Sequence, residues 1–93
     1  MFERILSRMR KKIRERKYIM TLHAEEEMNE DGLTIYDVER GILTGQISER
    51  QRDKVTAEWK YLITGETVEG REIELIAKLS PTGKLVLITV YTT

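Results

Sequence analysis

The chain has 93 residues, of which 40% are hydrophobic and 34% charged, a composition typical of one soluble globular domain with a single two-layer core. It contains no cysteine and one histidine, which excludes disulfides, thiolate metal sites and zinc sites built from several histidines. We expect neither a cofactor nor a metal in so small a core, and a cytoplasmic location, because the sequence has no signal peptide and no long apolar run.

The charges are unevenly distributed along the chain, although 16 basic residues balance 16 acidic ones. Residues 1–17 carry eight basic and two acidic side chains, a net charge of +6. Residues 18–39 carry seven carboxylates and no lysine or arginine. The sequence therefore predicts a dipolar molecule.

Residues 1–17 are predicted to form a basic amphipathic helix, which begins near residue 2 and ends near residue 16. Its apolar residues recur at helical spacing on one stripe: Phe2, Ile5, Leu6, Met9 and Ile13. Its basic residues include Arg10, Lys11 and Arg14, the candidate contacts to nucleic acid. Three interpretations stay open: packing on the protein's own surface or on a second copy in a homodimer, binding to RNA or DNA phosphates, and binding to an anionic membrane.

Two further helices are expected before the chain changes to a strand pattern. Residues 22–31 form the first, with Thr21 as the N-cap. Thr34 begins the second, because Asp37 stands where a capping box places its acidic partner. Gly45 follows the last apolar residue of this helix and is expected to end it.

Alternating apolar and polar residues after Gly45 predict β-strands. Four are expected, at residues 46–50, 55–63, 73–79 and 85–90. The short connections between them fit hairpins, so we predict a four-stranded antiparallel meander. Residues 18–93 then form a single α+β domain, in which two to three N-terminal helices pack on one face of the sheet.

His23 is the only side chain of a type that exchanges protons near neutral pH, and it lies in the first turn of a predicted helix. Catalysis would require partners from elsewhere in the chain. The simpler interpretation is that His23 caps the helix or packs locally.

Two short segments form a pattern that extends over the rest of the chain. The first, Thr21 to Leu33, contains His-Ala, a Met and a Gly-Leu, and the second is the strand Ile88-Thr-Val-Tyr91. Positions between them fit the same pattern: Val38, Ile42, Leu43, Gly45 and Ile47. Over about residues 19–92, this pattern resembles a bacterial family of domains of unknown function, family 4258.

The resemblance implies the fold of the RelE, barnase and colicin-type ribonucleases, two helices on a four-stranded antiparallel sheet. It also implies a toxin paired with a zinc-ribbon antitoxin, with RNA cleavage as the inherited activity. The family usually has arginine where this chain carries Glu27 and Asp31, so two phosphate contacts are replaced by carboxylates. Arg40, Arg71 and Lys78, together with the basic helix, are the candidate replacements.

Metal-free cleavage of RNA needs a base, an acid and a cation for the charge that develops on phosphorus. We expect His23 to act in acid–base chemistry, Tyr91 to act as an acid or an orienting group, and Arg71 or Lys78 to hold phosphate. Two alternatives remain: an inactive relative of such a toxin, and a non-catalytic module that binds a protein partner. The loss of the two arginines favours the latter.

Overall fold

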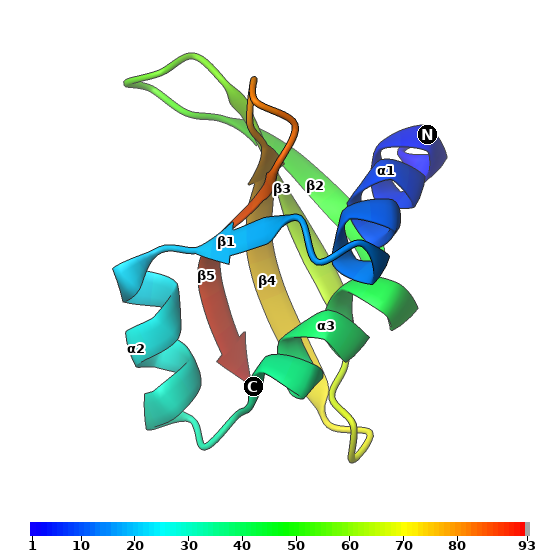
Figure 1. Cartoon of the computed structure of the whole chain (residues 1–93), viewed down its shortest axis with the longest axis vertical. Coiled ribbons are helices and arrows are strands. Elements are labelled where there is room, and N and C mark those ends of the chain that lie inside the picture. Colours follow the sequence, from blue (N-terminus) through cyan, green and yellow to red (C-terminus); the bar gives the residue numbers. More distant parts are fainter. Residues whose placement is uncertain (93) are drawn as a thin grey trace.

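Three helices and five strands make up the computed structural model, which describes residues 1–92 (Figure 1). In chain order they are α1 (Glu3–Arg14), β1 (Tyr18–Met20), α2 (Leu22–Glu30), α3 (Ile35–Thr44), β2 (Gln46–Arg52), β3 (Trp59–Glu66), β4 (Glu72–Leu79) and β5 (Leu85–Thr92). The strands lie in the order β1-β5-β4-β3-β2, and β2 to β5 form an antiparallel meander. The predicted α+β class is confirmed.

The sheet has five strands and is mixed, so the prediction of a four-stranded antiparallel sheet is wrong in this respect. The additional strand is β1, which pairs in parallel with Leu85–Leu87 of β5. The Thr21 backbone N–H extends the pairing by donating to the Leu87 carbonyl at 3.0 Å. A strand of three residues is too short to show an alternating pattern, which explains why the sequence did not reveal it.

The strand predicted at residues 55–63 begins later and ends later than expected. The Asp53 carboxylate accepts hydrogen bonds from the backbone N–H groups of Val55 (2.8 Å) and Thr56 (3.0 Å), and Ala57 has a positive φ of 61°. These features form a turn that occupies residues 53–57. The strand β3 therefore starts at Trp59, although the apolar alternation starts at Val55.

The predicted helix starts are confirmed by their hydrogen bonds. The Thr21 hydroxyl accepts from the Ala24 N–H at 3.1 Å, and the Asp37 carboxylate accepts from the Thr34 N–H at 2.9 Å. The helix α3 ends at Thr44, directly before Gly45. None of the helices within residues 1–92 has the length and apolar character that a membrane span requires.

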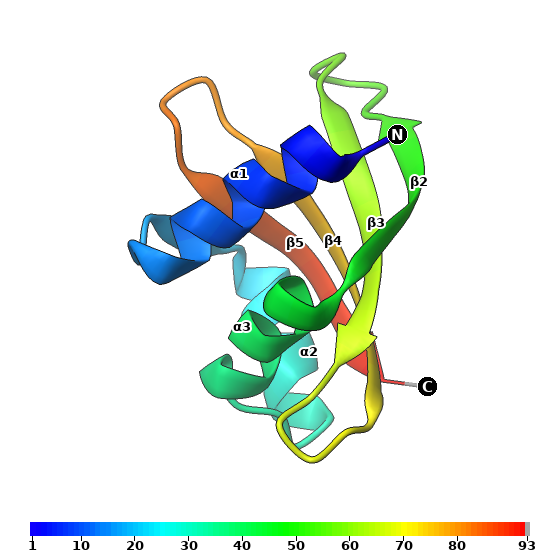
Figure 2. The ribbon, with the colours of Figure 1, turned by 90° about the vertical axis from the view of Figure 1, so that its right-hand side faces the viewer.

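α1 and α3 pack on one face of the sheet and bury the core between helices and strands (Figure 2). The apolar stripe of α1 contributes Leu6, Met9 and Ile13 to the buried residues. The largest fully buried side chains are Met9, Ile42, Ile63, Ile73, Leu75, Leu85, Leu87, Val38 and Val90. The first helix is therefore part of the same core as the rest of the chain.

α3 lies so close to β3 that the contact requires glycine. A Cβ atom at Gly65 would lie 2.1 Å from the Gly41 carbonyl oxygen, and one at Gly45 would lie 2.5 Å from the same oxygen. Arg10 joins α1 to α3, because its guanidinium donates to the carbonyls of Ile42 (3.3 Å) and Gly45 (2.8 Å). Arg10 thus satisfies carbonyl groups at the C-terminal end of α3.

Met9→Ala tests whether α1 belongs to the core. Because Met9 is 0% exposed, the truncation should lower the free energy of unfolding by about 2 to 5 kcal/mol. In a domain of this size the thermal midpoint should then fall by at least about 10 °C. Lys11→Ala, on the exposed side of the same helix, is the control and should change stability by less than about 0.5 kcal/mol. Equal midpoints for the two variants would contradict this account of α1.

Candidate functional site

Of the two expected catalytic residues, His23 contacts Glu27, and Tyr91 lies near enough for the charge of Glu27 to act on its phenol. His23 Nε2 is 3.2 Å from Glu27 Oε1, and the same oxygen accepts a hydrogen bond from the Val90 N–H at 3.2 Å. The phenol of Tyr91, the next residue along β5, is hydrogen-bonded to Glu74 on β4. This hydrogen bond, burial and the charges of Glu74 and Glu27 raise the pKa of Tyr91.

This arrangement exists because β5 is paired with β4 along its whole length, but on its outer side β1 pairs only with Leu85–Leu87. Beyond Leu87 the outer edge of β5 faces α2, and side chains of α2 take the place of backbone partners. The hydroxyl of Thr21 donates to the Ile88 carbonyl at 3.2 Å, Glu27 accepts from Val90, and Asp31 Oδ2 accepts from the Thr92 N–H at 3.1 Å. The open sheet edge is thereby closed.

Sequence reasoning missed this role of Glu27 and Asp31, although their spacing carries a signal. Four residues of helix rise by about 6 Å, and two residues of an antiparallel strand span about 7 Å. Carboxylates at i and i+4 can therefore reach the N–H groups of residues j and j+2. Arginine, the usual residue at both positions in the pattern described above, has no acceptor atom and could not make these bonds.

The electrostatics around His23 are unfavourable for a phosphate. Its ion-pair partner is Glu27, and within residues 1–92 no lysine or arginine forms an ion pair with that carboxylate. Tyr91 is held by Glu74, and its raised pKa makes it a weaker acid near neutral pH. The side chain that contacts His23 is a carboxylate, and its negative charge repels the phosphates of RNA.

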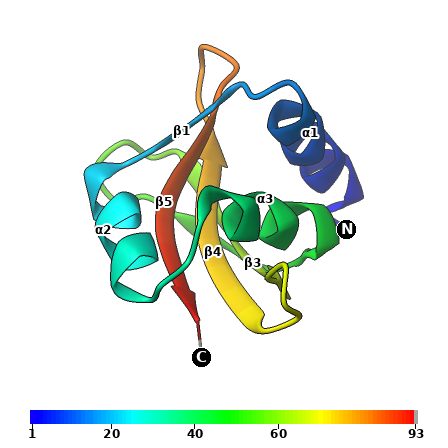
Figure 3. The same cartoon turned by 60° about the horizontal axis from the view of Figure 1, so that its bottom comes forward.

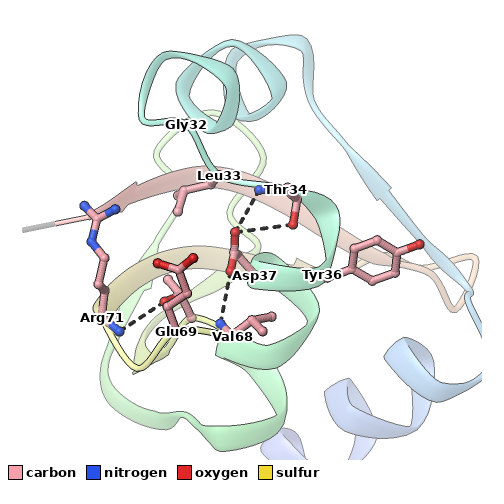
Figure 4. A pocket seen from close by; sticks show the side chains of 9 residues that line it. Gly32, Leu33, Thr34, Tyr36, Asp37, Val68, Glu69 and Arg71 are labelled. Atoms are coloured by element: carbon pink, nitrogen blue, oxygen red, sulfur yellow. Dashed lines mark hydrogen bonds between the residues drawn. The ribbon is translucent and has the colours of Figure 1, made fainter.

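Arg71 lies at a pocket of about 380 Å³ between the α2–α3 connection and the β3–β4 loop (Figure 4). Its guanidinium donates to the Thr92 hydroxyl at 3.3 Å, and the same hydroxyl lies 3.4 Å from Asp31 Oδ2. Asp37 shares the pocket and accepts from the Val68 N–H at 3.0 Å. The charge of Arg71 is therefore balanced by nearby carboxylates.

The other expected nucleic-acid contacts are placed in different surroundings. Lys78 lies 3.0 Å from Glu58 Oε2, a buried oxygen, in an ion pair without hydrogen-bond geometry. Arg10 caps α3 as described above. Lys11 and Arg14 on α1 and Arg40 on α3 are exposed and form no ion pair within residues 1–92. The structure thus places His23 next to Glu27 and Tyr91 within the influence of the same carboxylate, but it does not bring the six cations to them.

A second cluster, on the face that α1 covers, consists of Trp59 and two arginines of β2. The guanidinium carbon of Arg50 lies 3.9 Å from the Trp59 ring centroid, and that of Arg52 lies 4.8 Å from it. Sequence reasoning did not identify these partners of Trp59. The register of β2 and β3 places the arginines beside Trp59, since Arg52 pairs directly with Trp59 across the strands.

Fold and site together define a small α+β domain whose single histidine lies at a carboxylate-lined sheet edge, apart from its exposed cations. The described residues contain no group of three His, Asp or Glu side chains placed to hold a metal ion. The family model named Domain of unknown function (DUF4258) matches residues 20–92, and the chain belongs to this family. Comparison with curated proteins and with solved structures gives no match.

Glu27→Ala should open the edge of β5. The Val90 N–H loses a charged acceptor, and we expect the free energy of unfolding to fall by about 1 to 2 kcal/mol, with faster hydrogen exchange at the Val90 amide. Glu26→Ala is the matched control, because Glu26 is exposed and makes no such bond. If the Val90 amide exchanges its hydrogen at the wild-type rate in both variants, Glu27 does not close the edge.

Asp37 predicts a pH dependence of stability. Burial raises the pKa of Asp37, but hydrogen bonds from Thr34 and Val68 and the charge of Arg71 outweigh it, so the pKa lies below the ordinary value of 3.8. The stabilisation is fully present above 3.8 and is lost as the pH falls through the lowered folded value.

Asp37→Ala should accordingly cost about 1 to 2 kcal/mol at neutral pH, as expected for a lost capping interaction. The difference from the wild type should narrow as acid protonates Asp37. Urea unfolding of both proteins at neutral and acidic pH measures this difference in the free energy of unfolding. A difference that stays constant with pH would show that the charge of Asp37 does not contribute.

Proposed function

We propose that the protein is the toxin-like, RNA-binding component of a toxin–antitoxin pair, with a RelE/barnase-like fold, and that it does not cleave RNA at His23. The helices packed on an antiparallel meander support the proposed kinship in fold. The observation that carries the proposal is the separation between the exposed cations of α1 and the carboxylates around His23.

The separation follows from the placement of the helices. α1 and α2 lie on opposite sides of the molecule (Figure 3). The outer surface of α1 exposes Arg4, Arg8, Lys11 and Arg14. Exposed arginines and lysines without bound carboxylates attract the phosphates of RNA, since their positive charge is not already neutralised.

The surroundings of His23 support the second half of the proposal. A scissile phosphate at His23 Nε2 would lie beside Glu27, only 3.2 Å from that nitrogen. No arginine or lysine of residues 1–92 pairs with the same carboxylate, so nothing offsets the repulsion. His23 is 68% exposed, which also leaves the nitrogen in water rather than in a desolvated site.

A second candidate function is a non-catalytic module that binds a protein partner. Its support is a set of exposed apolar side chains on α2, α3 and the β3–β4 loop, namely Leu22 (70% exposed), Tyr36 (65%) and Val68 (62%). In the proposed pair, a zinc-ribbon antitoxin-like protein is the partner that such side chains would bind. A homodimer and a cytoplasmic location remain predictions.

RNA binding and RNA cleavage can be tested on the same material. The wild type should bind a labelled single-stranded RNA with an affinity that falls steeply with salt, and should leave total RNA intact on a gel. The double variant Lys11→Gln, Arg14→Gln should bind at least about tenfold more weakly, and its thermal midpoint should fall by only a few degrees, because both side chains are exposed and the variant loses only their interaction with the C-terminal end of the helix dipole.

His23→Ala is the control for cleavage, and we expect it to change neither binding nor RNA length. Cleavage by the wild type that drops by about 10²- to 10⁴-fold in His23→Ala would contradict the proposal and assign His23 to catalysis. RNA binding that is absent in the wild type, or unaffected by the double variant, would favour the protein-binding module instead.

A further inference from the structure

A groove of about 290 Å³ runs between the N-terminal half of α1 and the ends of two hairpins. Its lining residues are Ile5, Arg8, Glu58, Trp59, Tyr61, Leu79, Ser80 and Pro81. Figure 2 shows α1 crossing the sheet with the β2–β3 and β4–β5 connections extending beyond it. Tyr61 closes the inner end of the groove, where Phe2 packs edge-on against its ring at 6.0 Å.

Trp59 forms the outer end of the groove and is held by two arginines. Arg50 lies 3.9 Å and Arg52 lies 4.8 Å from its ring centroid, and Trp59 remains 38% exposed. A guanidinium stacked on indole keeps its N–H donors free in the plane, where they can bind phosphate oxygens. The cluster therefore combines an aromatic surface with two oriented cations that form no ion pair within residues 1–92.

We infer that this groove binds a segment of single-stranded RNA. One base stacks on the cluster of Trp59 and its guanidinium partners, and Arg50, Arg52 and Arg8 hold the flanking phosphates. The inference rests on the proposed function and specifies its ligand. A flat aromatic–guanidinium stack accepts the face of any base, and bases offer a free face only where the strand is single.

The charge of the groove agrees with this ligand. Its one carboxylate, Glu58, is neutralised by Lys78 at 3.0 Å on the same part of the sheet. Arg8 lines the groove from α1, whereas Arg50 and Arg52 on β2 reach it through their contact with the Trp59 ring. A strand lying between them would have its phosphates near arginine on either side of a stacked base.

Trp59 is the only tryptophan of the chain, so its fluorescence reports on the groove directly. The probe is an unlabelled oligouridine of about ten nucleotides, which is titrated into the full chain at low and at physiological salt concentration. We expect quenching of Trp59 fluorescence that saturates with RNA. The same RNA annealed to its complement should quench at least about tenfold less at equal concentration.

Variants separate stacking from charge. Trp59→Ala should weaken binding of the labelled oligouridine by about 5- to 100-fold, while Trp59→Phe, which keeps a ring, should lose less. Arg52→Ala should weaken binding and reduce the salt slope by about 1. Arg40→Ala removes the same charge from the exposed side of α3, outside the groove, and should cost no more than about twofold.

The outcomes distinguish the groove from the proposed function. RNA that binds to the wild type without quenching Trp59, with Trp59→Ala and Arg52→Ala equal to Arg40→Ala, overturns the groove and leaves binding to α1. No RNA binding at all overturns both proposals. If a thermal melt shows that Trp59→Ala is unfolded, two measurements still test the groove: the quenching of Trp59 in the wild type and the RNA affinity of the exposed Arg52→Ala variant.

Discussion

The incomplete pairing of β5 is the constraint on which much of this structure depends. β1 covers only Leu85–Leu87, so the rest of the strand would present free N–H groups at an open edge. Glu27 and Asp31 accept two of these N–H groups, which fixes α2 along the strand and sets its rotation. His23 then points to the same carboxylate because it lies one turn before Glu27.

Closing the edge with carboxylates has a consequence for function. The groups that satisfy β5 are anions, and they occupy the surroundings of the only histidine. Cations are instead found on α1 and β2: Arg8 lines one groove, and Arg50 and Arg52 contact Trp59, which lines the same groove. The carboxylates that stabilise one sheet edge thus lie apart from these cations, and the RNA site that we propose lies with the cations.

The parts of the fold that local signals specify could be predicted from sequence. Helix caps at Thr21 and Thr34, the end of α3 at Gly45 and the meander all depend on neighbouring residues or on periodicity. β1 and the role of Glu27 could not, because both depend on β5, which is distant in sequence. The same holds for the second cluster, because the stack of Arg50 on Trp59 depends on strand register, which no local pattern specifies.

α1 shows why the groove cannot be inferred from the family's own segment. The family match covers residues 20–92, and α1 precedes it. Yet α1 fills the core with Met9 and forms one wall of the groove with Arg8. Burial of the apolar stripe fixes the rotation of the helix, and this rotation directs Arg10 to α3 and Arg8 to the groove. Packing and the proposed RNA site are therefore coupled: a change that loosens Met9 would also displace Arg8, which lines the groove from α1.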